Sequence, residues 1–272
     1  MKKIVLLLAL GFGLAASAQE LYVFSEPASN MPAHTITPRF TSIFGSAPNR
    51  PDQRYTPELM LGLNRFFMVH GGVSFSNLPS GRLRYESAYL YGKYRFLSRD
   101  DVHRHFRLAA FAEGSYNRRD ALTDEISLQG ERSGVQLGLI ATQLLGRMAI
   151  SATAGHTQAL DAARFRHYNG DPVHPYQSVN YSVSAGLLVL PFSYTSYRQL
   201  NLNLYVELLG QRTLDQKTFY NDLAPAVQLL FNSNTKLNLG YRFQLKGDQL
   251  RNMTKTFLVS FEHTLFNMMG KH

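Results

Sequence analysis

Cysteine and tryptophan are both absent from the 272 residues. A chain without cysteine gains no stability from disulfides, so it depends on a large and continuous hydrogen-bond ladder. Without tryptophan, any aromatic belt at a membrane surface must be built from the 15 tyrosines and 18 phenylalanines. A closed β-sheet provides such a hydrogen-bond ladder.

Long apolar runs are missing beyond the first eighteen residues, and no nucleotide-binding loop is present. No later stretch reaches the roughly 20 apolar residues of a membrane-spanning helix, which excludes an ordinary inner-membrane protein. Because nothing in the sequence binds a nucleotide, any transport must be passive.

The start of the chain reads as a secretory signal. Lys2 and Lys3 precede a short apolar run, and residues 16–18 read Ala-Ser-Ala, which fits the A-x-A cleavage rule. We predict a signal peptide at residues 1–18 and a mature chain that begins at Gln19. Export leaves the periplasm, the medium and the outer membrane as destinations.

Acidic residues are few, with 19 Asp and Glu against 28 Lys and Arg. The formal charge of +9 falls to +7 when Lys2 and Lys3 are removed with the signal. Such a surplus suits anionic solutes or a lipopolysaccharide surface through long-range attraction. We predict no nucleic-acid partner, because the protein is exported.

Polar and apolar residues alternate through residues 178–190. One parity comprises Val179, Tyr181, Val183, Ala185, Leu187 and Val189, and the other comprises Asn180, Ser182, Ser184 and Gly186. Similar alternation predicts strands at residues 34–44, 55–64, 67–76, 82–96, 105–117, 132–145, 147–158, 178–190, 199–210, 222–232, 235–245 and 253–266. About twelve two-faced segments behind a signal peptide predict an all-β fold, a transmembrane antiparallel up-and-down β-barrel in the outer membrane.

The connections between these strands alternate in length. Tight turns are predicted at residues 65–66, 146 and 233–234, and long loops at 45–54, 118–131, 157–177 and 211–221. Outer-membrane barrels have short periplasmic turns and longer extracellular loops. We therefore predict that both termini are periplasmic, with a brief outward connection at 78–81 and a longer inward one at 97–104.

Parity also predicts which side chains face the lumen. A charge at the lipid-facing midplane would cost about 2–4 kcal/mol for Arg or Lys, whereas a polar lumen accepts it. Apolar stretches such as Leu59 to Leu63 and Val135 to Leu139 are assigned to lipid. The candidate selectivity residues of the lumen are Glu58, Arg84, Arg107, Glu113, Asn203, Tyr205, Glu207, Arg242 and Glu262. We predict that the four glutamates among them oppose the three arginines across the lumen, in rows that would create a transverse field across a narrow bore. Residues 82–96 give conflicting parity, which a bulge or a tyrosine-lined lumen would reconcile.

Residues 19–33 are the least ordinary stretch. Pro27 and Pro32 prevent regular strand pairing, so the segment is either a periplasmic leader that plugs or caps the barrel or a disordered leader. This opening resembles that of uncharacterised outer-membrane β-barrel proteins of Gram-negative bacteria, and the resemblance implies a location and a fold. Residues 34–266 are assigned to the barrel and 267–272 to a tail. The last strand resembles the C-terminal insertion signal of such proteins, although that signal usually ends the chain.

Metal binding and catalysis both have weak support. Met31 with His34, or Met68 with His70, would offer ligands for copper or zinc, but no spacing fixes a geometry. His70, Ser74 and Ser76 share one strand, yet the His-x-Ser and Asn-Gly arrangement of outer-membrane phospholipase is absent. We predict no metal, no cofactor and no enzymatic activity.

The longest predicted outer loop carries a basic and aromatic group, comprising Arg164, Arg166, His167 and Tyr168. It would bind lipopolysaccharide phosphates, fold inward as a constriction, or remain an ordinary solvated loop. We predict a monomeric, passive channel or transporter for small polar or charged solutes, in contact with outer-membrane lipid and lipopolysaccharide. The alternatives are a closed structural or interaction barrel with partner-binding loops, and an enzyme at the barrel rim.

Overall fold

Alternating polar and apolar residues form strands because successive side chains point to opposite faces of a sheet. The computed structural model describes residues 22–47, 50–78, 81–102, 104–118, 123–161, 174–193, 196 and 198–268. Within them, twelve strands occur: β1 Thr35–Ala47, β2 Arg50–Gly62, β3 Phe67–Ser76, β4 Arg84–Asp101, β5 Arg104–Asn117, β6 Gly134–Leu145, β7 Met148–Ala159, β8 Gln177–Leu190, β9 Asn201–Thr213, β10 Phe219–Phe231, β11 Thr235–Gly247 and β12 Lys255–His263. None of the described segments is a helix long and apolar enough to cross a membrane.

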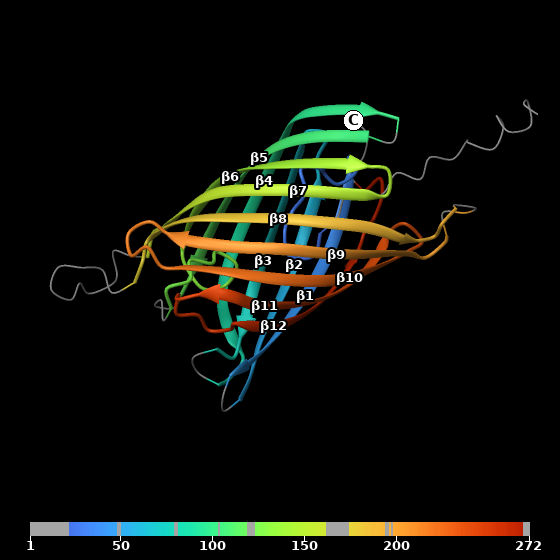
Figure 1. Cartoon of the computed structure of the whole chain (residues 1–272). Helices are drawn as coiled ribbons and strands as arrows, with labels where there is room; N and C mark the ends of the chain where they lie inside the picture. Colours follow the sequence, from blue (N-terminus) through green and yellow to red (C-terminus); the bar gives the residue numbers. More distant parts are fainter. Residues whose placement is uncertain are drawn as a thin grey trace, which may run out of the picture.

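Each strand pairs antiparallel with its neighbours in sequence, and the sheet closes on itself (Figure 1). Closure is made by β1 and β12, which pair from Arg39 opposite Glu262 to Gly45 opposite Thr256. The predicted up-and-down, twelve-stranded, all-β barrel is therefore confirmed. Closure removes the unpaired sheet edges that would otherwise expose backbone groups.

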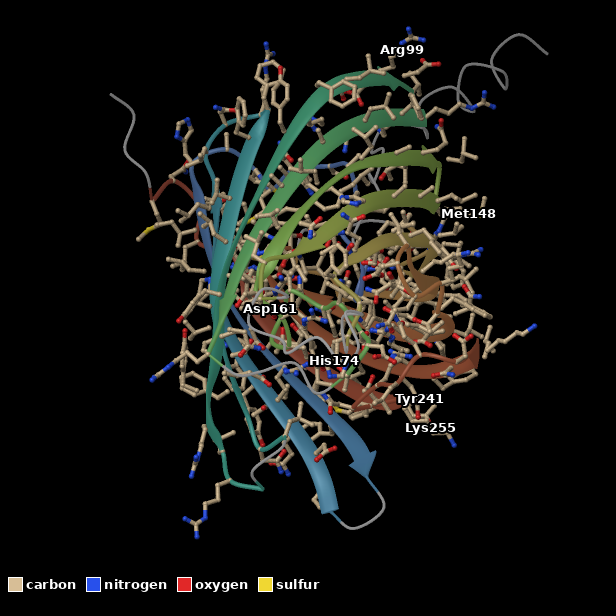
Figure 2. The ribbon with its side chains drawn as sticks, turned by 90° about the vertical axis from the view of Figure 1, so that its left-hand side faces the viewer. Arg99, Met148, Asp161, His174, Tyr241 and Lys255 are labelled. Atoms are coloured by element: carbon tan, nitrogen blue, oxygen red, sulfur yellow. The ribbon has the colours of Figure 1, made fainter. Side chains whose placement is uncertain are left out.

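The barrel is apolar outside and polar inside. On β6, Leu137 and Leu139 are 63% and 60% exposed, whereas the inward Thr142 is fully buried. The outer wall carries further exposed apolar side chains, including Phe40, Leu59, Leu90, Val183, Leu187, Val206 and Phe261. Most of the fully buried side chains of the inner wall are polar, which is the arrangement of a protein that lipid surrounds. Figure 2 shows these two populations of side chains on either side of the ribbon.

The two ends of the barrel differ in their connections. One end, which we call the turn end, carries the tight turns after β2, β6 and β10. The start of β1 and the end of β12 also lie at this end. The other, the loop end, carries the longer segments after β5, β7 and β11. This alternation follows the prediction except at three places. One is the predicted long loop at residues 211–221, which comprises only residues 214–218, because β9 and β10 pair as far as Arg212 opposite Phe219.

The predicted loop at residues 45–54 is wrong. β1 and β2 continue to pair as far as Ala47 opposite Arg50. Gly45 and Pro51 favour a loop in the sequence, but the continued ladder satisfies the backbone groups of both strands. The predicted connection at 97–104 is likewise mostly strand, because β4 and β5 pair out to Asp101 opposite Arg104. Arg99 marks the tip of this long hairpin in Figure 2.

Residues 82–96 contain both features that would reconcile their parity. The register of β3 and β4 shifts between Ser74 and Phe75, so that Glu86 is an extra residue and Tyr85 turns outward. Tyr89 and Tyr91 point inward and are buried, at 5% and 4% exposed. A bulge and an inward pair of tyrosines therefore coexist on one strand.

Candidate functional site

The interior of the barrel contains a cavity of about 570 Å³. Its walls come mainly from the inward side chains of β1, β2, β11 and β12. The described part of the leader, residues 22–33, forms one side of the cavity, and loop residues 125–131 form another. The cavity is thus bounded by the barrel wall and by two non-strand segments.

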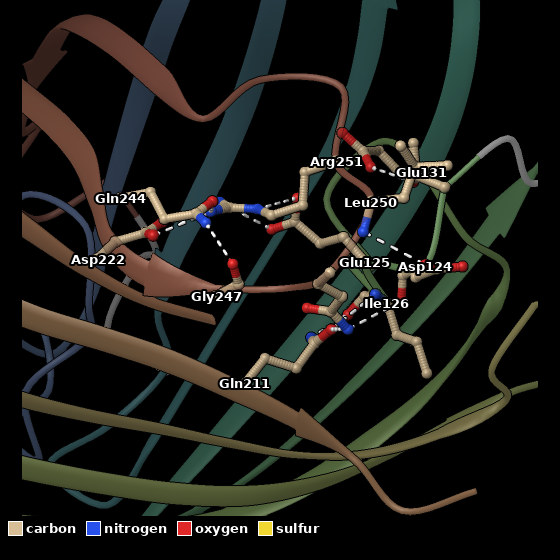
Figure 3. Close-up of polar contacts among 12 residues, drawn as sticks. Asp124, Glu125, Ile126, Glu131, Gln211, Asp222, Gln244, Gly247, Leu250 and Arg251 are labelled. Carbon is tan, nitrogen blue, oxygen red and sulfur yellow. Dashed lines mark hydrogen bonds and ion pairs between the residues drawn. The ribbon is translucent and has the colours of Figure 1, made fainter. Parts of the chain in front are cut away.

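The loop segment comprises residues 123–133, and we call it the inner loop. It follows β5 at the loop end and turns into the barrel rather than away from it. Ile126 is almost fully buried, and its backbone N–H donates to Gln211 Oε1 of β9 at 2.9 Å. Gln211 Nε2 donates back to the Ile126 carbonyl, also at 2.9 Å, and Gln249 Nε2 donates to the Asp124 carbonyl at 3.0 Å (Figure 3).

Buried ion pairs hold the C-terminal end of the inner loop in place. Arg132, with no exposed side-chain surface, donates from Nη2 to Asp161 Oδ1 at 2.9 Å. Arg54 of β2 contacts both Glu86 at 3.0 Å and Glu131 at 3.1 Å. These charge-assisted hydrogen bonds are among the stronger contacts available to a loop.

A third cluster joins the inner loop to the connection after β11. Arg251 donates to Glu125 Oε2 at 3.0 Å and to Asp222 Oδ1 at 2.9 Å (Figure 3). Arg242 donates to the same carboxylate, Asp222 Oδ2, at 2.6 Å. Two guanidinium groups and two carboxylates therefore compensate one another inside the barrel.

Protonation of the loop carboxyls follows from this surrounding charge. Burial raises the pKa of Glu125, but Arg251 and Arg242 outweigh it and hold that pKa below its usual range. Burial raises the pKa of Glu131 above its usual range, and Arg54 only partly offsets the rise. Burial lowers the pKa of Arg251, but Glu125, Tyr220 and Asp222 together outweigh this effect and raise it above its usual value.

The leader occupies the interior near the turn end. Glu207 Oε1 accepts hydrogen bonds from the backbone N–H groups of Val23 and Phe24, each at 2.9 Å. Lys93 Nζ donates to the carbonyls of Pro27 at 2.6 Å and Ser29 at 2.8 Å. Since Glu207 lies on β9 and Lys93 on β4, the leader crosses the bore.

Most of the predicted lumen residues occupy inward positions on the wall, but they do not form the predicted opposed rows of acids and bases across the bore. Glu58 pairs with Arg39 of the adjacent strand, with Arg39 Nη2 at 3.1 Å from Glu58 Oε1. Glu262 pairs with Lys236 of the adjacent strand at 2.9 Å. Neighbouring strands thus neutralise each other locally.

The other predicted positions vary in their surroundings. Glu207, Asn203, Tyr205 and Glu113 are buried in the inner wall, and Tyr205 packs against Tyr22 of the leader. Arg107 contacts Asp100 at 3.4 Å near the turn end. Arg84 lies exposed at the loop end, opposite Ser76. The predicted loop group of Arg164, Arg166, His167 and Tyr168 lies outside the described residues.

Cations outnumber anions around the cavity. Among the described residues that line it, eight are Arg or Lys and five are Glu, which leaves a surplus of three positive charges with His neutral. The cations are Arg39, Arg54, Arg65, Arg95, Arg107, Lys236, Arg242 and Arg251, and the acids are Glu26, Glu58, Glu125, Glu131 and Glu262. Such a surplus favours anions in the lumen.

The histidine and serine side chains weighed for metal binding and catalysis do not come together in the described part of the chain. In the described part of the chain, no three His, Asp or Glu side chains are grouped so as to hold a metal ion. His70 is buried, and neither of its ring nitrogens makes a hydrogen bond there. Ser74 lies near Thr56, with Oγ atoms 3.4 Å apart, so no His–Ser pair forms on β3.

Several functional contacts escaped the sequence interpretation. Arg39 lies within a predicted strand and shares parity with Thr37 and Thr41, so its inward position was available from the alternation. Lys93 lies in the strand of conflicting parity. Arg132 was placed in a strand and Asp161 in a loop, and nothing in the sequence joins them.

No family model and no curated protein matches this sequence. Among solved structures, the fold is similar to that of the COG4313 outer membrane channel from Pseudomonas putida F1, with a TM-score of 0.58 and 11% identity over 90% of this chain and 100% of that one. It is also similar to the NanC porin, with a TM-score of 0.52 and 9% identity over 85% of this chain and 100% of that one. The predicted resemblance to outer-membrane barrels is thereby confirmed at the level of fold.

Proposed function

We propose that this protein is an outer-membrane channel that passively admits small polar or charged solutes, with a preference for anions. The observation that carries the proposal is a polar cavity enclosed by a barrel whose outer wall is apolar. The two similar structures are described as an outer membrane channel and a porin, which supports the same function here. The predicted signal peptide supports an outer-membrane location, in contact with lipopolysaccharide, and we propose a monomer without enzymatic activity.

Selectivity in this channel arises from the cationic surplus rather than from opposed rows of charge. Lys236 and Glu262 are suited to test this, because both line the cavity and pair with each other at 2.9 Å. Removing either one changes the lumen charge by one unit while the other member of the pair stays in place. The two changes have opposite sign.

The experiment is single-channel recording in planar bilayers under a salt gradient. We expect discrete current steps and a reversal potential that reports a preference for anions. Glu262→Gln should increase that preference, and Lys236→Met should decrease it. Shifts in the same direction, or no shift in either variant, would show that ions do not pass along this wall.

The second candidate is a closed structural or interaction barrel. It is favoured by the inner loop and the leader, which both enter the bore and bond to its wall. In a closed barrel these segments stay bound under all conditions. Correctly folded protein would then give no current steps in any salt, with or without the leader.

A further inference from the structure

The leader is held inside the barrel without joining its sheet. Residues 22–34 form no strand, and the barrel closes between β1 and β12 without them. Pro27 and Pro32 lack the backbone N–H that continued pairing would need. The leader can therefore leave without any loss from the ladder of hydrogen bonds that holds the barrel together.

Three wall side chains bind the backbone of the leader. Glu207 accepts hydrogen bonds from the consecutive N–H groups of Val23 and Phe24. Lys93 donates to the carbonyls of Pro27 and Ser29, a few residues further along the leader. Thr142 Oγ1 accepts from the N–H of Ala28 at 2.8 Å. Glu207 and Thr142 are fully buried, and Lys93 is nearly so. Main-chain hydrogen bonds of this kind provide affinity for an extended peptide whatever its side chains.

Acidity is recognised by a second set of contacts. The carboxylate of Glu26 lies 3.4 Å from Lys93 Nζ and 3.6 Å from Arg39 Nη1, and Arg39 also lines the cavity. Burial raises the pKa of Glu26, but Lys93, His70 and Arg39 together outweigh this effect and lower that pKa to about 2. The side chain is therefore bound as an anion.

A small side chain and an aromatic side chain of the leader also pack closely against the barrel wall. Ala28 has no exposed surface and packs in a cluster with Tyr91, Ala109, Phe111 and Ile140. The ring of Phe24 lies against Gly240, where an added Cβ would come within 2.5 Å of it. A larger residue at either place would not fit, which gives the wall selectivity in addition to affinity.

We infer that the inner wall from Glu207 to Lys93 is a binding site for an extended acidic peptide, and that the leader is its tethered, releasable occupant. This inference rests on the proposed channel function. When the leader is bound it narrows the bore, and when it leaves, the bore widens and the site accepts a short acidic peptide from solution. The leader thereby competes with peptides that enter the channel.

The direct experiment uses a variant that lacks residues 22–33 and a synthetic peptide with the sequence of those residues. We expect the variant to conduct more than the full chain, and the peptide to block it reversibly in a concentration-dependent manner. A peptide with Glu26→Lys should block far less well, because it brings a cation against Lys93 and Arg39. A shuffled peptide of the same composition controls for unspecific block.

Wall variants in the shortened barrel test the contacts one at a time. Lys93→Met and Glu207→Gln should each weaken the peptide block by roughly tenfold or more, since hydrogen bonds to charged groups carry that much affinity. Lys255→Met is the matched control for Lys93→Met, because Lys255 is exposed at the start of β12, at the loop end of the barrel and away from the leader. Equal block in all three variants would overturn the inference.

A disulfide lock tests release in the full chain. Ser25 and Ser184 have their Oγ atoms 2.8 Å apart, and the chain contains no cysteine of its own. We expect Ser25→Cys with Ser184→Cys to conduct at a steady low level when oxidised and to gain larger openings when reduced. The same current in both redox states would overturn the inference even if the shortened variant failed to fold.

The two proposals fail in different ways. If no variant conducts, with the leader locked, free or removed, the proposed channel function is wrong. If the channels conduct but neither the lock nor the peptide changes the current, the channel stands and the peptide site is wrong.

Discussion

The buried pair of Arg132 and Asp161 should control whether the inner loop stays in the barrel. Arg132 donates from Nε and Nη2 to Asp161, at 2.9–3.1 Å, and the Ser133 N–H donates to the same carboxylate at 3.0 Å. The side chains of Arg132 and Asp161 are 0% and 2% exposed. Asp161→Asn keeps the shape of the side chain but removes the charge that compensates this guanidinium.

Removing one member of a buried ion pair typically costs about 3–5 kcal/mol, because the other charge stays desolvated. The equilibrium between docked and undocked inner loop should therefore shift by roughly 10²–10⁴-fold toward undocking. Because the barrel ladder does not depend on this loop, the cost should appear as local opening and not as unfolding of the barrel.

Hydrogen exchange measures this opening directly. The Ile126 amide, which bonds to Gln211, should exchange much faster in Asp161→Asn, and trypsin should cut after Arg132. Asp100→Asn is the matched control, since Asp100 also pairs with an arginine but has a side chain 52% exposed and should change stability by less than about 1 kcal/mol. Unchanged protection of Ile126 in Asp161→Asn would refute the reasoning.

Three further predictions follow from the wall and the loop. Leu137→Arg, on the lipid-facing wall, should lower the free energy of unfolding in bilayers by about 2–4 kcal/mol, whereas Leu137→Met should lower it by less than about 1.5 kcal/mol. Reversible unfolding in vesicles measures both changes. Equal stability of the two variants would contradict the outward direction assigned to Leu137. Burial raises the pKa of Glu131 in the docked loop, so this carboxyl takes up a proton more readily there than when the loop is undocked. Docking should therefore strengthen as the pH falls from neutral through this raised pKa. The protection factor of the Ile126 amide should rise over this range in the wild type but not in Glu131→Gln. In stronger acid, Glu125 should lose its charge and its pairing with Arg251, so protection should fall again, and a continued rise would contradict this role of Glu125.

The architecture could be predicted from sequence because a barrel wall has a period of two. Parity predicts that Leu137 and Leu139 point outward. It likewise predicts that Glu207 and Glu262 point inward. Parity failed to decide at β4, because the extra residue Glu86 reverses it against β3 and a second extra residue, Phe96, shifts the register against β5. Local sequence carries no record of such a shift, which depends on the partner strand.

The contents of the lumen could not be predicted in the same way. Glu207 and Val23 lie 184 residues apart in the chain, and Arg132 and Asp161 belong to segments without a regular period. Contacts of this kind depend on how the closed barrel positions distant segments. The sequence indicated that residues 19–33 are unusual, through Pro27 and Pro32, but not which wall groups would bind them.

Single-channel current through the purified, folded protein tests the central claim, that solutes cross the membrane through the interior of this barrel. The account predicts discrete steps with anion preference in the full chain, and larger steps when residues 22–33 are removed. Bilayers that contain the folded protein, yet show no steps in any salt with or without those residues, would contradict it.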